Sequence, residues 1–212
     1  MIFRVDRMIA DVRVAIDLNA GDRQLLGEHD IDTLEMDRLI GSKLLDACRL
    51  VLLEAPRELL CTGHTFKDAK IDWNANAEFK DVALPQDFLR LIAFQMGEWH
   101  RPVREPIGED SPQYDIQFSR FSGIRGNNSR PVAAIVMTEG GKVLRFRPTS
   151  PDDIIMTADY QPKPMIDRDG GIDLPEELYK ACVLRSGALA LATYGDQLSS
   201  TMMEMSKSMI ES

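Results

Sequence analysis

Cysteine and histidine, from which most metal centres and many nucleophilic sites are built, are scarce in this chain. The 212 residues include three of each, and neither set has the spacing of a metal-binding motif. Cys48 and Cys182 lie among apolar residues with helical spacing, so we expect them, like Cys61, to be reduced and buried. We therefore expect no metal and no cofactor, while a site assembled from distant residues stays open as the alternative.

Motifs of ligand-binding loops and of catalysis are also few. The segment 166–173, IDRDGGID, alternates acids with glycines but lacks the distal glutamate of a calcium-binding loop, so a turn is the favoured interpretation. The loop 123–131 contains only Gly123-x-x-Gly126, without the lysine and the helix of a phosphate-binding loop. No nucleophile motif or paired histidine is present. We expect no catalytic residues and no enzyme activity.

Basic residues are outnumbered, with 25 against 34 acidic residues and a net charge of −9. Tight sequence-independent binding of nucleic acid needs a basic surface, so this composition disfavours it. An acidic surface instead suits a passage through which DNA slides without sticking. Charged residues interrupt the apolar pattern of residues 1–19, which predicts neither a signal peptide nor a membrane span, and hence a protein of the cytoplasm.

Apolar residues at helical spacing predict helices at both ends of the chain. The first is expected over 2–18 and the second over 32–55, where Pro56 makes continuation costly. A third is expected over 175–194, and its run of small side chains lets another backbone approach closely. A last segment, 197–212, is rich in methionine.

The middle of the chain changes to a β pattern. Glu139-Gly140-Gly141 separates two apolar runs and predicts a tight hairpin. Strands are expected at 88–94, 114–118, 131–137, 142–146 and 153–160. These patterns predict an α+β fold, with helices at both ends of the chain and a central antiparallel β-sheet or small barrel.

Two groups of residues are candidates for contacts with other molecules. The first is the apolar cluster near the C-terminus, which consists of Met202, Met203, Met205, Met209 and Ile210. It predicts either a last helix folded onto the chain's own core or a tail held by a partner. The second comprises aromatic and arginine side chains, the types that anchor interfaces. Its members are Trp99, Arg101 and Arg104.

The order of these segments resembles a known family. Two helices are followed by a β region that begins with LPQDFLRLIAFQMGEWHRPV and continues through SPQYDIQFSRFSGIRGNNSRPVAAIVMTEGGKVLRF. A helix at LPEELYKACVLRSGALALATYG and a trailing helix complete the chain. This arrangement is similar to that of the head-to-tail adaptors of tailed bacteriophages, the connector or gatekeeper proteins of the neck.

The resemblance implies a structural protein of the virion that joins the portal to the tail. It also implies that the terminal helices form one helical bundle, 1–70 and 165–212, into which the β region, 71–164, is inserted as a tail-facing lobe. Copies would form a homo-oligomeric ring, commonly twelve-fold, that lines the channel for the packaged double-stranded DNA without binding it tightly. The C-terminal segment would grip the portal protein. Loops of the β lobe would contact a tail or nozzle protein, among them the loop 123–130 with Arg125, Asn127 and Asn128. The protein would lie in the host cytoplasm before assembly and in the virion neck afterwards, with no membrane contact.

Two other interpretations of the sequence remain open. One is a small cytoplasmic enzyme or ligand-binding domain with a pocket between helices and sheet. The other is a different neck or tail-completion protein. The size of the assembled protein separates the first of these from an adaptor, because an adaptor forms a ring alone or on its portal.

Overall fold

The computed structural model describes residues 1–20, 33–60, 63–72, 79–119, 121, 123–150 and 153–211. The chain divides into two compact units. A helical unit comprises Met1–Cys61 and Lys163–Ser212, and a β unit comprises Thr62–Pro162. This confirms the expected α+β fold, in which a β region interrupts a helical bundle.

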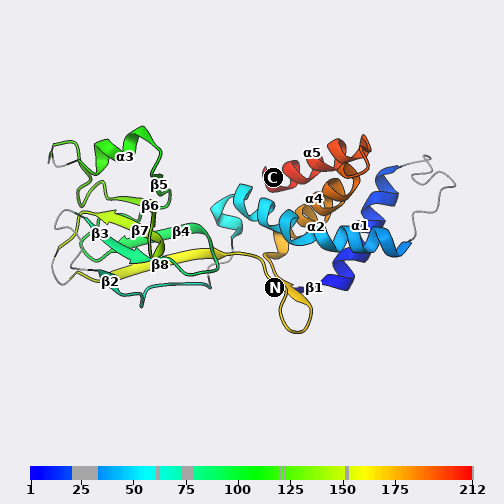
Figure 1. Ribbon diagram of the computed structural model, residues 1–212, viewed down its shortest axis with the longest axis horizontal. Coiled ribbons are helices and arrows are strands. Elements are labelled where there is room, and N and C mark those ends of the chain that lie inside the picture. The colour runs from blue at the N-terminus through cyan, green and yellow to red at the C-terminus, as the bar shows by residue number, and fades with distance from the viewer. Residues whose placement is uncertain are drawn as a thin grey trace. The chain divides into compact units, whose positions relative to one another are not determined.

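The helical unit consists of four longer helices that lie side by side, with a short strand pair beside them (Figure 1). The helices are α1 (Val5–Ala20), α2 (Thr33–Glu54), α4 (Tyr179–Ala192) and α5 (Leu198–Glu211). Short 3₁₀ turns, η1 (Arg57–Leu59) and η2 (Glu176–Leu178), follow α2 and precede α4. Strands β1 (Ile2–Arg4) and β9 (Gly171–Asp173) pair in antiparallel fashion.

Helix α4 is the centre of the helical unit and packs against α1, α2 and α5. Nearly all of its side chains are buried, including Arg185 and Ser186, because it is surrounded by the other helices. The neighbouring helices bury one stripe each. On α1 the buried stripe is Met8, Val12 and Ile16. The expected first helix was placed too early, since Ile2 lies in β1 and not on the helix.

Gly187 shows what the small residues of α4 allow. A Cβ atom at this position would lie 2.6 Å from Cε of Met202 on α5 and 3.4 Å from Cγ1 of Ile16 on α1. The space beside this small residue is thus filled by side chains of the neighbouring helices, and not by the close backbone that the run of small residues predicted. Gly195, with a φ of 69°, then permits the turn between α4 and α5.

The β unit has two layers of strands. One is a five-stranded sheet in the order β2-β3-β7-β6-β5, antiparallel except that β5 and β6 run parallel. Its strands are β2 (Ile71–Asp72), β3 (Lys80–Ala83), β5 (Ile107–Gly108), β6 (Val132–Thr138) and β7 (Gly141–Arg147). The other layer pairs β4 (Phe88–Met96) with β8 (Ile155–Pro162).

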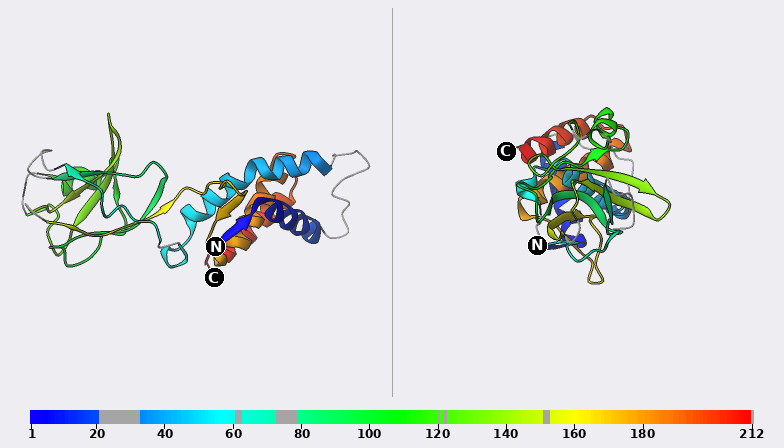
Figure 2. Two further views of the ribbon diagram at one scale, coloured as in Figure 1. Left: turned by 90° about the horizontal axis from the view of Figure 1, so that it is seen from below. Right: turned by 90° about the vertical axis from the view of Figure 1, so that its left-hand side faces the viewer.

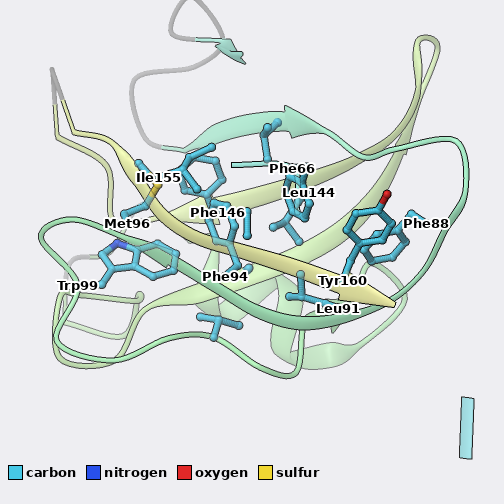
Figure 3. Packing of buried hydrophobic residues seen from close by; sticks show 14 residues of the cluster. Phe66, Phe88, Leu91, Phe94, Met96, Trp99, Leu144, Phe146, Ile155 and Tyr160 are labelled. Carbon is cyan, nitrogen blue, oxygen red and sulfur yellow. The ribbon is translucent and has the colours of Figure 1, made fainter. Parts of the chain in front are cut away.

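An aromatic core fills the space between these layers. Figure 3 shows its members, in which Phe94 of β4 lies near Phe146 of β7, with ring centroids 5.0 Å apart. Trp99 and Tyr160 lie toward opposite ends of the same cluster. Phe66 also belongs to it, and its amide donates a hydrogen bond to the carbonyl of Ala158. Residues 63–70 therefore belong to the β unit and not to the bundle in which they were expected.

The hairpin predicted at Glu139-Gly140-Gly141 is confirmed. Strands β6 and β7 pair from Val132 with Arg147 to Thr138 with Gly141, so only two residues lie in the turn. Gly141 has a φ of 114°, a conformation that favours glycine. The end of this hairpin projects from the rest of the β unit (Figure 2).

The prediction of a strand at 114–118 is wrong. Residues Pro112–Gln117 form a short helix, α3. The side chain of Ser111 accepts a hydrogen bond from the amide of Gln113, and Pro112 is the first helical residue, which together begin a helix. Among the described residues, none of the helices has the combination of length and apolarity needed to cross a membrane.

Candidate interaction surfaces

The methionine-rich segment forms helix α5, which packs against α4. Met202 is fully buried and Ile210 is 4% exposed, and Ser206 is buried between them on the same face. The prediction that Met202 and Ile210 contact a partner is therefore corrected, because both belong to the core of the helical unit. Of the two alternatives that the sequence left open, the structure has a last helix folded onto its own bundle.

The other face of α5 remains accessible. Met205 and Met209 are 36% and 37% exposed, and they lie one helical turn apart, while Met203 is partly buried against the core. Glu204 and Lys207 are exposed on the same helix. A contact between α5 and a partner would therefore use Met205 and Met209, and this stays a prediction.

A buried arginine fixes the positions of three helices in the helical unit. The guanidinium of Arg185 on α4 donates two hydrogen bonds to the carboxylate of Glu54 at the end of α2, at 3.0 and 2.6 Å. Its Nε donates to Oγ of Ser206 on α5, which in turn donates to the carbonyl of Ala181. The hydrogen bonds from Arg185 lower the pKa of Glu54.

A groove with an apolar floor runs along α2 beside α4. Leu50 and Leu53 of α2 and Leu189 of α4 line it, and Lys43, Asp46 and Arg49 form its charged rim. Its volume is about 460 Å³. Leu50 and Leu53 are 38% and 41% exposed. Burying such apolar side chains is favourable, so their exposure makes the groove a candidate contact surface.

Trp99 was expected at an interface, and the structure corrects this. Its side chain is only 3% exposed, because it packs edge-on against Phe94 and Phe146 in the core of the β unit. The indole N–H donates to the carbonyl of Pro148 at 3.1 Å, which satisfies its single donor. Trp99 therefore stabilises the β unit and presents nothing to a partner.

Arginine side chains gather at a hollow of about 330 Å³ in the β unit. Arg101, Arg125 and Arg130 line it. The amide side chains that line it are Gln113 and Gln117 of α3 and Asn127, and its apolar residues are Ile107, Ile124, Pro131 and Val132. Within the described residues, none of the three arginines has an ion pair or a side-chain hydrogen bond. We call this site the arginine hollow.

Hydrogen bonds hold the loop that forms one wall of the arginine hollow. Oδ1 of Asn127 accepts from the amides of Ser129 and Arg130, at 3.0 and 2.9 Å. The amide of His100 donates to the carbonyl of Asn128, and Oγ of Ser129 lies 3.1 Å from Nδ1 of His100. The segments that carry Arg101 and Arg130 are thus joined directly.

A partly buried arginine, Arg145, positions the opposite wall. Arg145 of β7 donates two hydrogen bonds to Asp81 of β3, at 2.9 and 2.8 Å, and a third to the hydroxyl of Tyr114 on α3. Its guanidinium also lies over the ring of Phe79, 4.1 Å from the centroid. The hydrogen bonds to Asp81 raise the pKa of Arg145, so the charge that holds α3 persists at any accessible pH.

The structure brings together four of the six residues expected at a subunit or tail interface. Arg101, Arg125 and Asn127 line the arginine hollow, and Asn128 lines a more open hollow beside it, together with Arg125 and Asn127. Arg104 is exposed but lines neither. Their role as an interface stays a prediction.

Sequence reasoning missed Arg130, Gln113 and Gln117, and the whole groove along α2. The two glutamines were assigned to a loop and a strand, and the strand pattern of 114–118 hid the face that α3 presents. For the groove a signal existed: Leu50 and Leu53 stand three apart on a helix whose buried stripe is completed by Leu44, Val51 and Leu52.

The described residues hold no group of three or more histidine, cysteine or acidic side chains that could bind a metal ion. Cys48 of α2 and Cys182 of α4 are buried free thiols, and a hydrogen bond between them, together with burial, raises the pKa of Cys182. A neutral buried thiol is a poor nucleophile, which fits a role in the core. Cys61 lies outside the described residues.

In comparisons with known proteins, no family model matches this chain and no curated protein matches it significantly.

Proposed function

We propose that this chain is a structural virion protein, a ring-forming head-to-tail adaptor that joins the portal to the tail of a bacteriophage. The observation that carries the proposal is the order of elements: α1 and α2, then the β unit, then α4 and α5 returning to the same bundle. That is the order on which the resemblance to phage adaptors rests. The proposal gives each unit one contact, the bundle with the portal and the β unit with the tail.

The groove along α2 supports assembly into a ring. Burial of its exposed leucines, Leu50 and Leu53, against a second copy of the chain would stabilise the assembly. Its rim carries both positive and negative side chains, which suits a polar interface rim. Helix α1 offers a candidate counterpart, since Val14 and Leu18 are 55% and 77% exposed. A groove on one face of the bundle and an apolar strip on another helix make a head-to-tail contact, the type that closes into rings.

The distribution of charge supports a channel for DNA. The helical unit contains 20 acidic and 13 basic residues, and the β unit contains 14 and 12, so most of the net charge of −9 is on the bundle. An excess of carboxylates repels phosphate groups. DNA would then pass the bundle without being retained.

Light scattering on the purified chain, alone and mixed with the portal of the same phage, tests the proposal. We expect a ring in one of the two samples, because adaptors assemble alone or on their template. Leu50→Asp with Leu53→Asp should abolish this assembly, since charges placed in an apolar contact are costly to bury. Met137→Asp is the matched control, because Met137 is 63% exposed at the β6–β7 hairpin. A wild-type chain that stays monomeric in both samples contradicts the proposal.

The portal contact is tested at α5 by substitution and not by deletion. Removing 197–212 would expose the core around Gly187 and Ala188, since Met202 and Ile210 are buried. We expect Met205→Glu with Met209→Glu to prevent portal attachment and to leave the fold intact. Thr201→Glu, on an exposed position of the same helix, should leave attachment unchanged. Equal portal attachment by the wild type, the double variant and Thr201→Glu would show that α5 does not contact the portal.

A further inference from the structure

The three arginines of the arginine hollow form no ion pair with the described part of the chain. Arg101, Arg125 and Arg130 line one cavity, and no carboxylate is among the described residues that line it. The chain as a whole has 34 acidic residues for 25 basic ones, so three arginines without ion pairs on one cavity run against its composition. Unpaired guanidinium groups are common on surfaces, but three that share a single hollow produce a local positive potential.

The hollow also has the shape and the polarity of a site for side chains. Gln113, Gln117 and Asn127 contribute amide groups, and Ile124 and Val132 contribute apolar surface. A carboxylate accepts hydrogen bonds from guanidinium and amide N–H groups, and arginine binds it in a two-pronged geometry. The apolar lining adds contacts for the aliphatic part of the same ligand.

The walls of the hollow are held in place before any ligand arrives. Arg145 holds α3 through Tyr114, and a hydrogen bond from Arg147 to the carbonyl of Ser119 holds the chain just after α3. The turn at Asn127 and its contacts with His100 hold the opposite wall. Because the backbone of these walls is held by hydrogen bonds, a ligand would bind at little cost in backbone entropy, which favours affinity.

From these observations we propose that the arginine hollow binds an acidic protein segment, one that presents carboxylates beside aliphatic side chains. The inference is independent of the proposed function, since a partner of this chemistry can bind whether or not the chain forms a ring.

Duplex DNA fits the same charges less well. The turn before α3 carries Glu109 and Asp110, and α3 itself carries exposed Asp115, so an extended polyanion would meet carboxylates next to the hollow. None of the described residues that line the hollow is aromatic, so the hollow lacks the aromatic side chains on which successive bases stack. A short acidic segment avoids the neighbouring carboxylates and uses the apolar lining.

Fluorescence anisotropy on the full chain tests this proposal with three labelled probes. The first is a synthetic peptide of alternating glutamate and leucine pairs, the second is the same peptide with glutamine in place of glutamate, and the third is a short DNA duplex. We expect the glutamate peptide to bind with a Kd below about 1 mM, and more weakly as salt is raised. The glutamine peptide and the duplex should bind at least about tenfold more weakly.

Substitutions at the hollow locate the binding. Arg125→Gln with Arg130→Gln should weaken binding of the glutamate peptide by about tenfold or more, because each substitution removes a charged donor. Arg104→Gln is the matched control, an exposed arginine that does not line the hollow, and it should change the affinity less than about twofold. Circular dichroism and tryptophan fluorescence confirm that each variant is folded.

Three results would overturn the proposal. They are no binding of the glutamate peptide at about 1 mM, equal weakening by Arg104→Gln and by the double substitution, and tighter binding of the duplex than of the peptide. The last result would assign the hollow to nucleic acid.

Discussion

The two units of this protein are stabilised in different ways. The β unit has a core of large aromatic side chains, in which Phe66, Phe94, Phe146 and Trp99 contact one another. The helical unit has a central helix of small residues, and its helices are fixed by the buried Arg185. In the β unit, large aromatic rings fill the core, and the loops lie outside it. In the helical unit, small residues fill the centre, and larger apolar side chains such as Leu50 and Leu53 lie on the outside.

This difference explains where the candidate surfaces lie. In the β unit the core buries most of the described aromatic residues, whereas charged and amide side chains of α3 and of the loop 123–131 are accessible to other molecules. In the helical unit, Leu50 and Leu53 remain outside because α4 already fills the centre. One unit therefore presents charge and the other presents apolar surface.

Removing a ring from the aromatic core should have the largest effect. Phe94 is fully buried, and Phe94→Ala should lower the free energy of unfolding of the β unit by about 3–5 kcal/mol, since it leaves a cavity. Both tryptophans, Trp73 and Trp99, are in the β unit, so tryptophan fluorescence follows this unit while the helical circular dichroism signal follows the bundle. We expect a shift of the fluorescence transition. An equal shift of both signals would show that the units unfold as one.

The opposite result is expected for the buried arginine. Arg185→Ala should destabilise the helical unit by about 3 kcal/mol, because it empties a buried side-chain site and removes a partner of the buried Ser206. The loss of the bond to Glu54 adds little, since that side chain is 41% exposed and water can solvate its carboxylate. The control is Arg13→Ala, which removes a half-exposed ion pair with Asp37 and should cost less than about 1 kcal/mol. The helical transition should move and the fluorescence transition should stay. Similar effects of the two substitutions would contradict the assigned role of Arg185.

The same ion pair predicts a dependence on acid. Arg185 holds the pKa of Glu54 below its ordinary value of 4.5, so its stabilising contribution is complete above 4.5 and is lost as the pH falls through the lowered value. The stability difference between the wild type and Glu54→Gln should therefore be present at neutral pH and shrink in acid. Denaturant titrations followed by circular dichroism measure this difference in stability. A difference that grows as the pH falls would contradict the lowered pKa of Glu54.

A smaller effect is expected at Gly187. Gly187→Val should destabilise the helical unit by about 2 kcal/mol, since its Cβ would lie 2.6 Å from Cε of the buried Met202 and its two methyl groups would find no space in this core. At Gly41 of α2 a Cβ would meet only Cδ1 of Ile9, at an ordinary 3.6 Å. Gly41→Ala should therefore stabilise the unit by about 0.5–1 kcal/mol through its higher helix propensity. Thermal unfolding compares the two, and a stabilising Gly187→Val would mean that α4 is not closely packed.

The smallest effect is expected at the rim of the aromatic core. Tyr160 donates a hydrogen bond to Asp87, and burial together with this bond raises the pKa of Tyr160 to about 12. Its stabilising contribution is complete below 10.0, the ordinary value, and is lost as the pH rises through about 12. Tyr160→Phe should cost about 1 kcal/mol at neutral pH and less in strong alkali. A cost that does not change between neutral and alkaline pH would contradict this assignment.

The sequence predicted the elements whose signals are local. The turn at Glu139-Gly140-Gly141 and the helices 32–55 and 175–194 follow from glycine chemistry and apolar spacing. It failed at 114–118, because a six-residue helix that depends on Ser111 and Pro112 has no periodicity long enough to detect. Trp99 was misplaced for a different reason: only the fold shows that a tryptophan beside charged residues points inward.

The candidate sites depended even more on the fold. Arg101, Arg125 and Arg130 are up to 29 residues apart, and a turn and two hydrogen bonds to His100 bring them to one hollow. Met202 and Met205 lie in one methionine-rich stretch, yet the first is buried and the second is exposed. Composition identifies such residues as candidates, and the helix face on which each lies decides its role.

Electron cryo-microscopy of the phage particle that carries this chain tests the adaptor proposal most directly. We predict a ring of density between portal and tail into which the four-helix unit and the β unit fit, with α2 at the contact between neighbouring copies. A neck that contains no density for this polypeptide, or a ring whose subunits meet away from α2 and α1, would contradict the account.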